Sequence, residues 1–206
     1  MYIPEFNRPK DRSATLAFMR ANPFAILVSI MDRIPFATHL PLMVDEAGGQ
    51  IVVRGHMARA NAHWKSMQEG QESLIVFHGP HAYISPSLYE IRESVPTWNY
   101  AAVHVYGEPT VFWDEEGLKE TLHRMINTFD SSYLEQWSEL SDAYRSRMMK
   151  HIVGFEIKVK RLEAKFKLSQ NRTKGEQARV IQALNQSQDS NISGVAELMR
   201  QEGLGR

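Results

Sequence analysis

The sequence predicts a mainly β protein, an antiparallel barrel with helices at its periphery. Short apolar segments typical of strands gather in the first half of the 206-residue chain, and turn sequences such as Asp45–Gly49 link them as in hairpins. These segments do not alternate regularly with helical ones, which argues against a parallel dinucleotide-binding sheet. Hydrophobic residues make up 43% of the chain, which is enough for the core of such a fold.

Local signals place the elements of the first third of the chain. Ser13 is the expected N-cap of a helix that ends before Pro23, because the residue before a proline avoids the α region. The apolar run FAILVSI predicts a buried strand, and an Asp32-Arg33 turn joins it to its partner, IPFATHLPLMV. The expected order is a helix at 14–21, strands at 24–30, 34–44 and 50–55, and a helix at 58–67 that starts directly after the third strand.

The rest of the chain continues with strands and then turns helical. Asp114 is the expected cap of a helix whose apolar stripe includes Leu118 and Met125. The expected order is strands at 73–79 and 82–85 interrupted at Gly79-Pro80, a long strand at 97–113 bent at 107–109, helices at 115–129, 134–140 and 142–152, and a final strand at 154–168. The helical, polar tail suggests two domains, at 1–172 and 173–206.

Composition excludes several classes of protein. The 24 basic and 24 acidic side chains balance, so the overall charge does not favour binding to nucleic acid. Cysteine is absent, which fits a reducing cytoplasm, and no apolar run is long enough to cross a bilayer. The glycine-rich, nucleophile-elbow and zinc-protease motifs of common enzyme families are also missing.

A candidate anion site lies in RGHMARAN, residues 54–61. Here a strand would deliver Gly55 and a helix would begin just after it, so that free backbone N–H groups and the positive helix end attract an anion. His56, Arg59 and Asn61 add donors. The alternative is an ordinary strand-to-helix turn with a solvated Arg59.

Alternation along FATHLPL places Ala37 and His39 on one face of a strand and Thr38 and Leu40 on the other. Pro41 has no N–H, so this strand should lie at a sheet edge, a bulge or a pocket rim. His39 could form a hydrogen bond to a ligand there, or it could be a half-buried histidine with an internal hydrogen-bond partner.

The region from Leu74 to Gly107 combines aromatic and small residues, as a pocket for an aromatic ligand would. Ser85, Thr97 and Asn99 could supply its hydrogen bonds, although the aromatic residues could equally reflect β propensity. His78 and His81 raise the question of a metal, but good metal sites add carboxylates or cysteines and second-shell partners to such a pair, so we expect none.

KFKLSQNR, residues 165–172, places Lys165 and Lys167 on one face of a strand. Two lysines beside Gln170 and Asn171 could form the rim of a site for an anion or a carbonyl group. They could equally be a solvated strand edge, where lysine blocks aggregation.

Six segments, taken together, resemble the PaiB family of FMN-binding, transcriptional-regulator-like proteins, which are related to the pyridoxamine phosphate oxidase-like proteins. The segments are MYIPEF, HLPL, GHMARAN, GPHAYISPSLY, VPTWNYAAVHVYG and KFKLSQNR, in the expected order between Met1 and Arg172. The resemblance implies a six-stranded split β-barrel of the FMN-binding type with added C-terminal helices. It also implies a homodimer with FMN held at the interface by both chains.

The resemblance also implies roles for individual residues. Thr38, His39, Leu40 and Pro41 would border the isoalloxazine, and His56, Met57, Ala58, Arg59 and Asn61 would bind the phosphate. Ser85, Trp98 and Asn99 would reach the flavin from the partner subunit, and Lys165, Lys167, Gln170 and Asn171 would close the site. Either lysine near N1 and C2=O would shift the flavin potential. No residue stands out as catalytic.

The function implied is a negative transcriptional regulator that controls protease production and sporulation and acts on promoter DNA or a regulatory partner. Two helical segments of the tail, 173–184 and 192–201, are loosely similar to a helix-turn-helix, but an ordinary packed pair fits them better. One alternative is a flavin-dependent oxidoreductase or flavin reductase. Another is haem binding or degradation through one of the eight histidines.

Overall fold

The computed structural model describes residues 1–67 and 70–206, and its chain divides into two compact units. Unit 1 comprises Met1–Asn22, Phe77–His104 and Glu163–Arg206. Unit 2 comprises Pro23–Val76 and Val105–Leu162. Among the described helices, none is long and apolar enough to cross a membrane.

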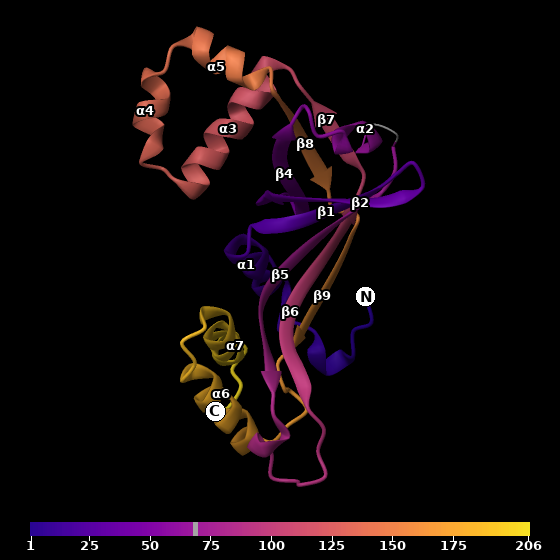
Figure 1. The fold of residues 1–206 in the computed structure, drawn as a ribbon, viewed down its shortest axis with the longest axis vertical. Coiled ribbons are helices and arrows are strands. Elements are labelled where there is room, and N and C mark those ends of the chain that lie inside the picture. Colours follow the sequence, from indigo (N-terminus) through magenta and orange to yellow (C-terminus); the bar gives the residue numbers. More distant parts are fainter. Residues whose placement is uncertain (68–69) are drawn as a thin grey trace. The chain divides into compact units, whose positions relative to one another are not determined.

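The strands of the described residues form two sheets, and the fold is mainly antiparallel β with helices, as expected (Figure 1). One sheet has five strands in the order β2-β1-β5-β6-β9, and the other has four in the order β3-β4-β8-β7. The expected count of six strands therefore differs from what the structure shows. The bounds are β1 Phe24–Met31, β2 Ile34–Pro41, β3 Met43–Ala47, β4 Gln50–Ala58, β5 Ser73–Ile84, β6 Thr97–Gly107, β7 Pro109–Phe112, β8 Ile152–Lys158 and β9 Arg161–Lys167.

The β1–β2 hairpin of unit 2 forms as the sequence predicts. Asp32 and Arg33 both have positive φ, at 52° and 66°, which matches the twist that a two-residue hairpin turn needs. β2 lies at the edge of its sheet, so Pro41 at its end breaks no inner ladder.

β4 is longer than expected, and this changes the candidate anion site. The strand runs through Gly55 to Ala58, where it pairs with Ile152 of β8, and the Arg59 N–H still donates to the His151 carbonyl at 2.7 Å. The helix expected at 58–67 is reduced to α2, His63–Ser66. A strand pairing has overridden local helical preference, and the idea of an anion on a helix end directly after Gly55 is wrong.

The long strands expected at 97–113 and 154–168 each divide between the two sheets. β6 ends at Gly107 and β7 begins at Pro109, while β8 ends at Lys158 and β9 begins at Arg161. A side chain at Gly107 would collide with the Lys158 carbonyl oxygen. Glycine is therefore needed where the end of β6 approaches the end of β8.

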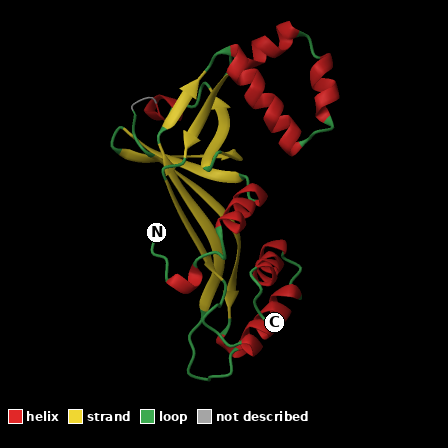
Figure 2. Ribbon diagram, turned by 180° about the vertical axis from the view of Figure 1, so that it is seen from behind, coloured by secondary structure: helices red, strands yellow, loops and turns green. Residues whose placement is uncertain are grey.

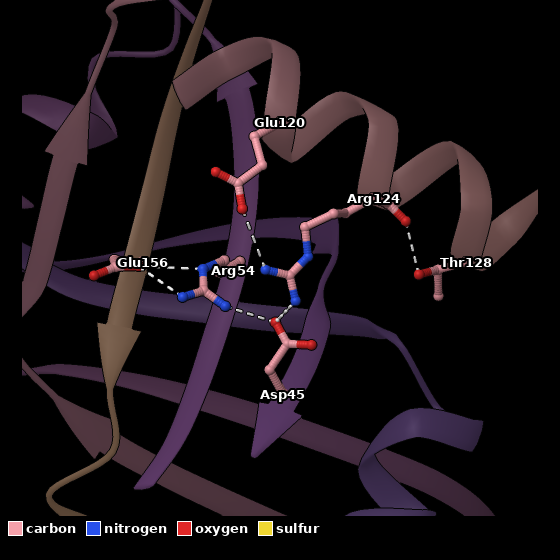
Figure 3. A network of polar contacts seen from close by, with 6 residues as sticks. All are labelled: Asp45, Arg54, Glu120, Arg124, Thr128 and Glu156. Atoms are coloured by element: carbon pink, nitrogen blue, oxygen red, sulfur yellow. Dashed lines mark hydrogen bonds and ion pairs between the residues drawn. The ribbon is translucent and has the colours of Figure 1, made fainter. Parts of the chain in front are cut away.

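Three helices of unit 2 follow β7: α3 Glu115–Phe129, α4 Tyr133–Glu139 and α5 Asp142–Met149. Asp114 caps α3 as expected, with its carboxylate accepting the Gly117 N–H at 2.8 Å. α3 packs against β4 and β8. A polar network secures it there, in which Asp45 accepts from both Arg54 and Arg124 at 2.6 Å (Figure 3).

Unit 1 holds α1 Arg12–Ala21, α6 Lys174–Asn185 and α7 Ser190–Gln201. The cap of α1 is Asp11 and not Ser13, since the Asp11 carboxylate accepts the Ala14 N–H at 2.8 Å. α6 starts with a full capping box between Thr173 and Glu176. α6 and α7 pack side by side (Figure 2).

β5 runs without a break through Gly79-Pro80, where an interruption was expected. A Cβ at Gly79 would lie 2.6 Å from the Phe18 ring, so this glycine allows α1 to approach the strand. The Asn191 side chain of α7 bonds both the N–H and the carbonyl of His81, at 3.1 and 3.0 Å. These contacts belong to unit 1.

Candidate functional site

The expected site residues fall into two groups, one in each unit. Unit 2 holds Thr38, His39, Leu40, Pro41, His56, Met57, Ala58, Arg59 and Asn61, and unit 1 holds Ser85, Trp98, Asn99, Lys165, Lys167, Gln170 and Asn171. Within each group the structure brings together residues that are far apart in the sequence.

A polar network in unit 2 joins β2 to the segment that follows β4. The Thr38 hydroxyl accepts from the Asn61 amide at 3.1 Å and lies 2.8 Å from His63 Nδ1. The Asn61 side-chain carbonyl accepts the His63 backbone N–H at 3.1 Å. These bonds hold the backbone from Asn61 to His63 against β2, so the loop after Arg59 has a defined conformation.

His63 is a residue that the sequence reasoning missed. Its side chain is fully buried, and Phe36 meets its ring edge-on with centroids 5.1 Å apart. Burial lowers the pKa of His63, which favours the neutral form of the ring. The Thr38 hydroxyl can accept from Asn61 and still either donate to Nδ1 or accept from it, and in both cases the buried Nε2 has no hydrogen-bond partner among the described residues.

Arg59 extends from the end of β4 and is exposed. Its guanidinium contacts only the Lys150 carbonyl, at 3.5 Å, and in residues 1–67 and 70–206 it has no carboxylate partner. The Trp64 indole donates to the Arg59 carbonyl at 2.9 Å, and the exposed Lys65 lies 5.9 Å from the Trp64 ring centre. Two exposed cations therefore lie close to Trp64 in the sequence, and within residues 1–67 and 70–206 neither has a carboxylate partner, an arrangement that suits an anion.

The other expected residues of β4 and β2 have different surroundings. His56 is half-buried with Nδ1 3.2 Å from the Met125 sulfur of α3, and burial lowers its pKa. Met57 and Leu40 are buried in the core. His39 is exposed beside Phe24, on the face of β2 opposite Thr38 and Leu40, as the alternation predicted.

In unit 1, the two lysines of β9 lie among aromatic and polar groups. Lys167 donates to the Thr97 hydroxyl and, at 2.9 Å, to the Trp98 carbonyl. Lys165 lies 5.6 Å from the ring centre of Tyr2 and 5.5 Å from that of Tyr100. β9 is an edge strand, which fits both interpretations of these lysines, the rim of a site for an anion or a carbonyl group and a solvated strand edge.

Three polar residues of this group have internal partners. Asn99 is fully buried and donates to Ser169 at 2.9 Å. Gln170 accepts the Leu168 N–H at 2.7 Å and donates to the Phe166 carbonyl, and Ser85 accepts the Ser87 N–H in the 3-10 helix η3, Pro86–Leu88. Trp98 and Asn171 are exposed, and the Trp98 ring contacts those of His81 and Tyr83. The described residues contain no cluster of three metal-ligating side chains.

Residues 1–161 match the family described as "Putative FMN-binding domain". The chain belongs to this family. It is 38% identical to the "Protease synthase and sporulation protein PAI 2" of Bacillus subtilis, over 97% of this chain and 96% of that protein. Membership confirms the FMN cofactor that the resemblance implied.

Two solved structures share the fold. The flavocytochrome Anf3 of Azotobacter vinelandii aligns with a TM-score of 0.60 at 16% identity, covering 80% of this chain and 72% of that one. The FAD and heme binding protein of Mycobacterium smegmatis also aligns with a TM-score of 0.60, at 10% identity, covering 78% and 73%. At these low sequence identities, the two comparisons show the fold alone.

The chemistry of the unit 2 group fits FMN. The FMN phosphate needs cationic donors that lack a competing carboxylate, and Arg59 and Lys65 meet that need among the residues that the structure describes. The family's FMN-binding description and these donors therefore agree.

Proposed function

We propose that the protein is a cytoplasmic, homodimeric FMN-binding regulator of the PaiB type, with FMN phosphate bound at Arg59. The observation that carries the FMN site is the exposed Arg59 guanidinium without a carboxylate partner, on a loop that Thr38, Asn61 and His63 hold in place. The regulatory role rests on the likeness to the Bacillus subtilis protein, whose name refers to protease synthesis and sporulation.

The isoalloxazine would lie along β2, from Thr38 to Pro41, and a second copy of the chain would complete the site with its Ser85, Trp98 and Asn99 segments. The exposed aromatic side chains of unit 1 support this arrangement, since Tyr83 is 51% exposed and Trp98 52% exposed in a single chain. Such surface aromatic groups favour contact with a flat ring or with another protein. In the dimer the two sheets would form the split barrel, with residues 173–206 as a helical addition.

FMN, when bound, would supply the redox chemistry, and the chain's own residues would bind and orient it. Arg59 and Lys65 would hold the phosphate. The Asn61 and Thr38 side chains would fix the loop between Arg59 and Lys65. Backbone groups of β2 would contact the edge of the isoalloxazine ring. The buried His63 would hold this loop against β2 through its contact with Thr38.

The test is the absorption spectrum of the purified protein before and after FMN is added and unbound flavin removed, together with its mass in solution. Two flavin bands at one FMN per chain and a dimeric mass would support the proposal. A colourless protein that takes up no FMN would contradict it. Gel shifts with promoter DNA that respond to FMN would support regulation, whereas rapid NADH or NADPH oxidation would favour the oxidoreductase and a Soret band the haem protein.

A further inference from the structure

A cavity of about 310 Å³ lies in unit 1, against β9 and the N-terminal segment, at the lower end of the range of small-molecule sites. Its walls come from three parts of the chain that are distant in sequence but belong to the same unit. Asn7, Tyr89, Lys165, Lys167 and Arg172 are among the residues that line it.

The cavity is strongly cationic. Lys165, Lys167 and Arg172 line it, and none of the described residues that line it is acidic. Neither lysine has a carboxylate partner in the part of the chain that the structure describes. Arg172 stacks 3.7 Å from the Tyr89 ring centre, and the nearby Glu176 carboxylate accepts the Glu90 N–H at 2.9 Å and the Thr173 N–H at 3.2 Å.

The charges of the two lysines are unfavourable to one another. Burial, followed by repulsion from Lys165, lowers the pKa of Lys167. An anion in the cavity would offset both effects. The cavity therefore gains stability from a negatively charged occupant, whereas a neutral occupant would leave the repulsion between the two ammonium groups in place.

A second feature points to the same cavity. Asn7 lines it, is only 3% exposed, and its side-chain oxygen has no hydrogen-bond partner. A buried acceptor without a donor is unfavourable, so an N–H or O–H group that a ligand brings to this oxygen would be stabilising. Tyr2, Phe6 and Tyr89 add ring surface to the walls.

We propose that this cavity binds a small organic anion, other than FMN, that carries a planar ring and a hydrogen-bond donor. The lysines and Arg172 would hold its acidic group, Asn7 its donor, and the aromatic walls its ring. Oxidised isoalloxazine is uncharged, so a flavin ring alone would not need these cations, and the proposed site for the FMN phosphate is at Arg59.

The test is equilibrium dialysis of the full chain against 4-aminobenzoate, which has the three features, and against 4-aminobenzamide, which has the same shape without the charge. We expect saturable binding of one 4-aminobenzoate per chain and affinity for the amide weaker by about tenfold or more. Equal affinity for the two, or no saturable binding of 4-aminobenzoate at millimolar concentration, would overturn the proposal.

Variants assign the binding to this cavity. Lys165→Gln and Lys167→Gln should each weaken 4-aminobenzoate binding by about tenfold. Lys160→Gln is the matched control, because that exposed lysine pairs with Glu108 and should leave binding unchanged. Unchanged binding in both cavity variants, with thermal unfolding as in the parent protein, would refute the assignment.

Repeating the dialysis with excess FMN separates this proposal from the proposed function. If FMN competes with 4-aminobenzoate, the cavity is part of the flavin site and the inference is wrong. If FMN leaves 4-aminobenzoate binding intact, the inference stands. Lysine-dependent 4-aminobenzoate binding by a protein that takes up no FMN would refute the proposed function alone.

Discussion

The Thr38 hydroxyl and His63 Nδ1 lie 2.8 Å apart, and this bond joins the edge strand β2 to the loop that carries Arg59 and Asn61. Because Asn61 also donates to Thr38, one hydroxyl bonds a side chain of that loop and the first side chain of α2. The conformation proposed for phosphate binding therefore depends on a residue of a different strand.

Thr38→Val should destabilise the fold by about 1–3 kcal/mol, because it removes the partner of Asn61 and leaves both ring nitrogens of a buried histidine unpaired. Urea unfolding measures the change. Thr110→Val makes the same substitution at an exposed position of β7, where we expect less than about 0.5 kcal/mol. Equal effects of the two substitutions would show that the Thr38 bonds contribute nothing specific.

Acid should weaken the fold through its buried histidines. Burial lowers the pKa values of His56 and His63 from 6.5 in the folded state, so the unfolded chain binds protons first as the pH falls. With respect to these two histidines, the free energy of unfolding should be constant above pH 6.5 and should decrease as the pH falls below 6.5. His63→Gln should reduce the slope of stability against pH below 6.5, and an unchanged slope would exclude His63 as a contributor.

Asp45 should matter more to stability than an exposed ion pair does. It accepts from both Arg54 and Arg124, and Arg54 also pairs with Glu156 at 3.1 Å. Asp45→Asn leaves two neighbouring guanidinium groups with less countercharge, and with these side chains partly exposed we expect a loss of about 1–2 kcal/mol. Glu108→Gln breaks only the exposed pair with Lys160 and should cost about 0–1 kcal/mol in the same denaturation assay.

Gly107→Ala and Gly175→Ala should change stability in opposite directions. A Cβ at Gly107 collides with the Lys158 backbone, which has little freedom to move, and should cost about 1–3 kcal/mol. Gly175 lies in α6, where the nearest atom to an added Cβ is the Glu90 carboxylate at 3.5 Å, so alanine should gain up to about 1 kcal/mol. Thermal unfolding shows both changes, and a tolerated Gly107→Ala would disprove the close approach.

Signals within a few residues predicted much of the fold. The Asp32-Arg33 turn and the Asp114 cap depend on adjacent residues, and both were predicted. The segment after Gly55 was not, because the local sequence from Ala58 onward suits a helix, and pairing with β8 keeps Met57 and Ala58 extended. The division of residues 97–113 between two sheets depends likewise on the approach of Gly107 to Lys158.

In the candidate site, too, features that depend on contacts between distant residues could not be predicted from the sequence. Arg59 could be selected from its sequence neighbours, but the roles of Asn99 and Gln170 could not, because their partners Ser169 and Phe166 become visible only in the folded chain. His63 was missed for a related reason. It sits only two residues after Asn61, yet its significance comes from Thr38, which lies on another strand.

The measurement that tests the FMN site most directly is FMN affinity in Arg59→Ala. The loss of a charge-assisted phosphate contact of about 1.5–3 kcal/mol should weaken binding by roughly 10- to 150-fold. Arg147→Ala, an exposed arginine of α5 in the same unit whose ring contact is Tyr144, should bind FMN like the parent protein. Weakening confined to Arg59→Ala is the predicted result, and equal FMN affinity in both variants and the parent would contradict a phosphate site at Arg59.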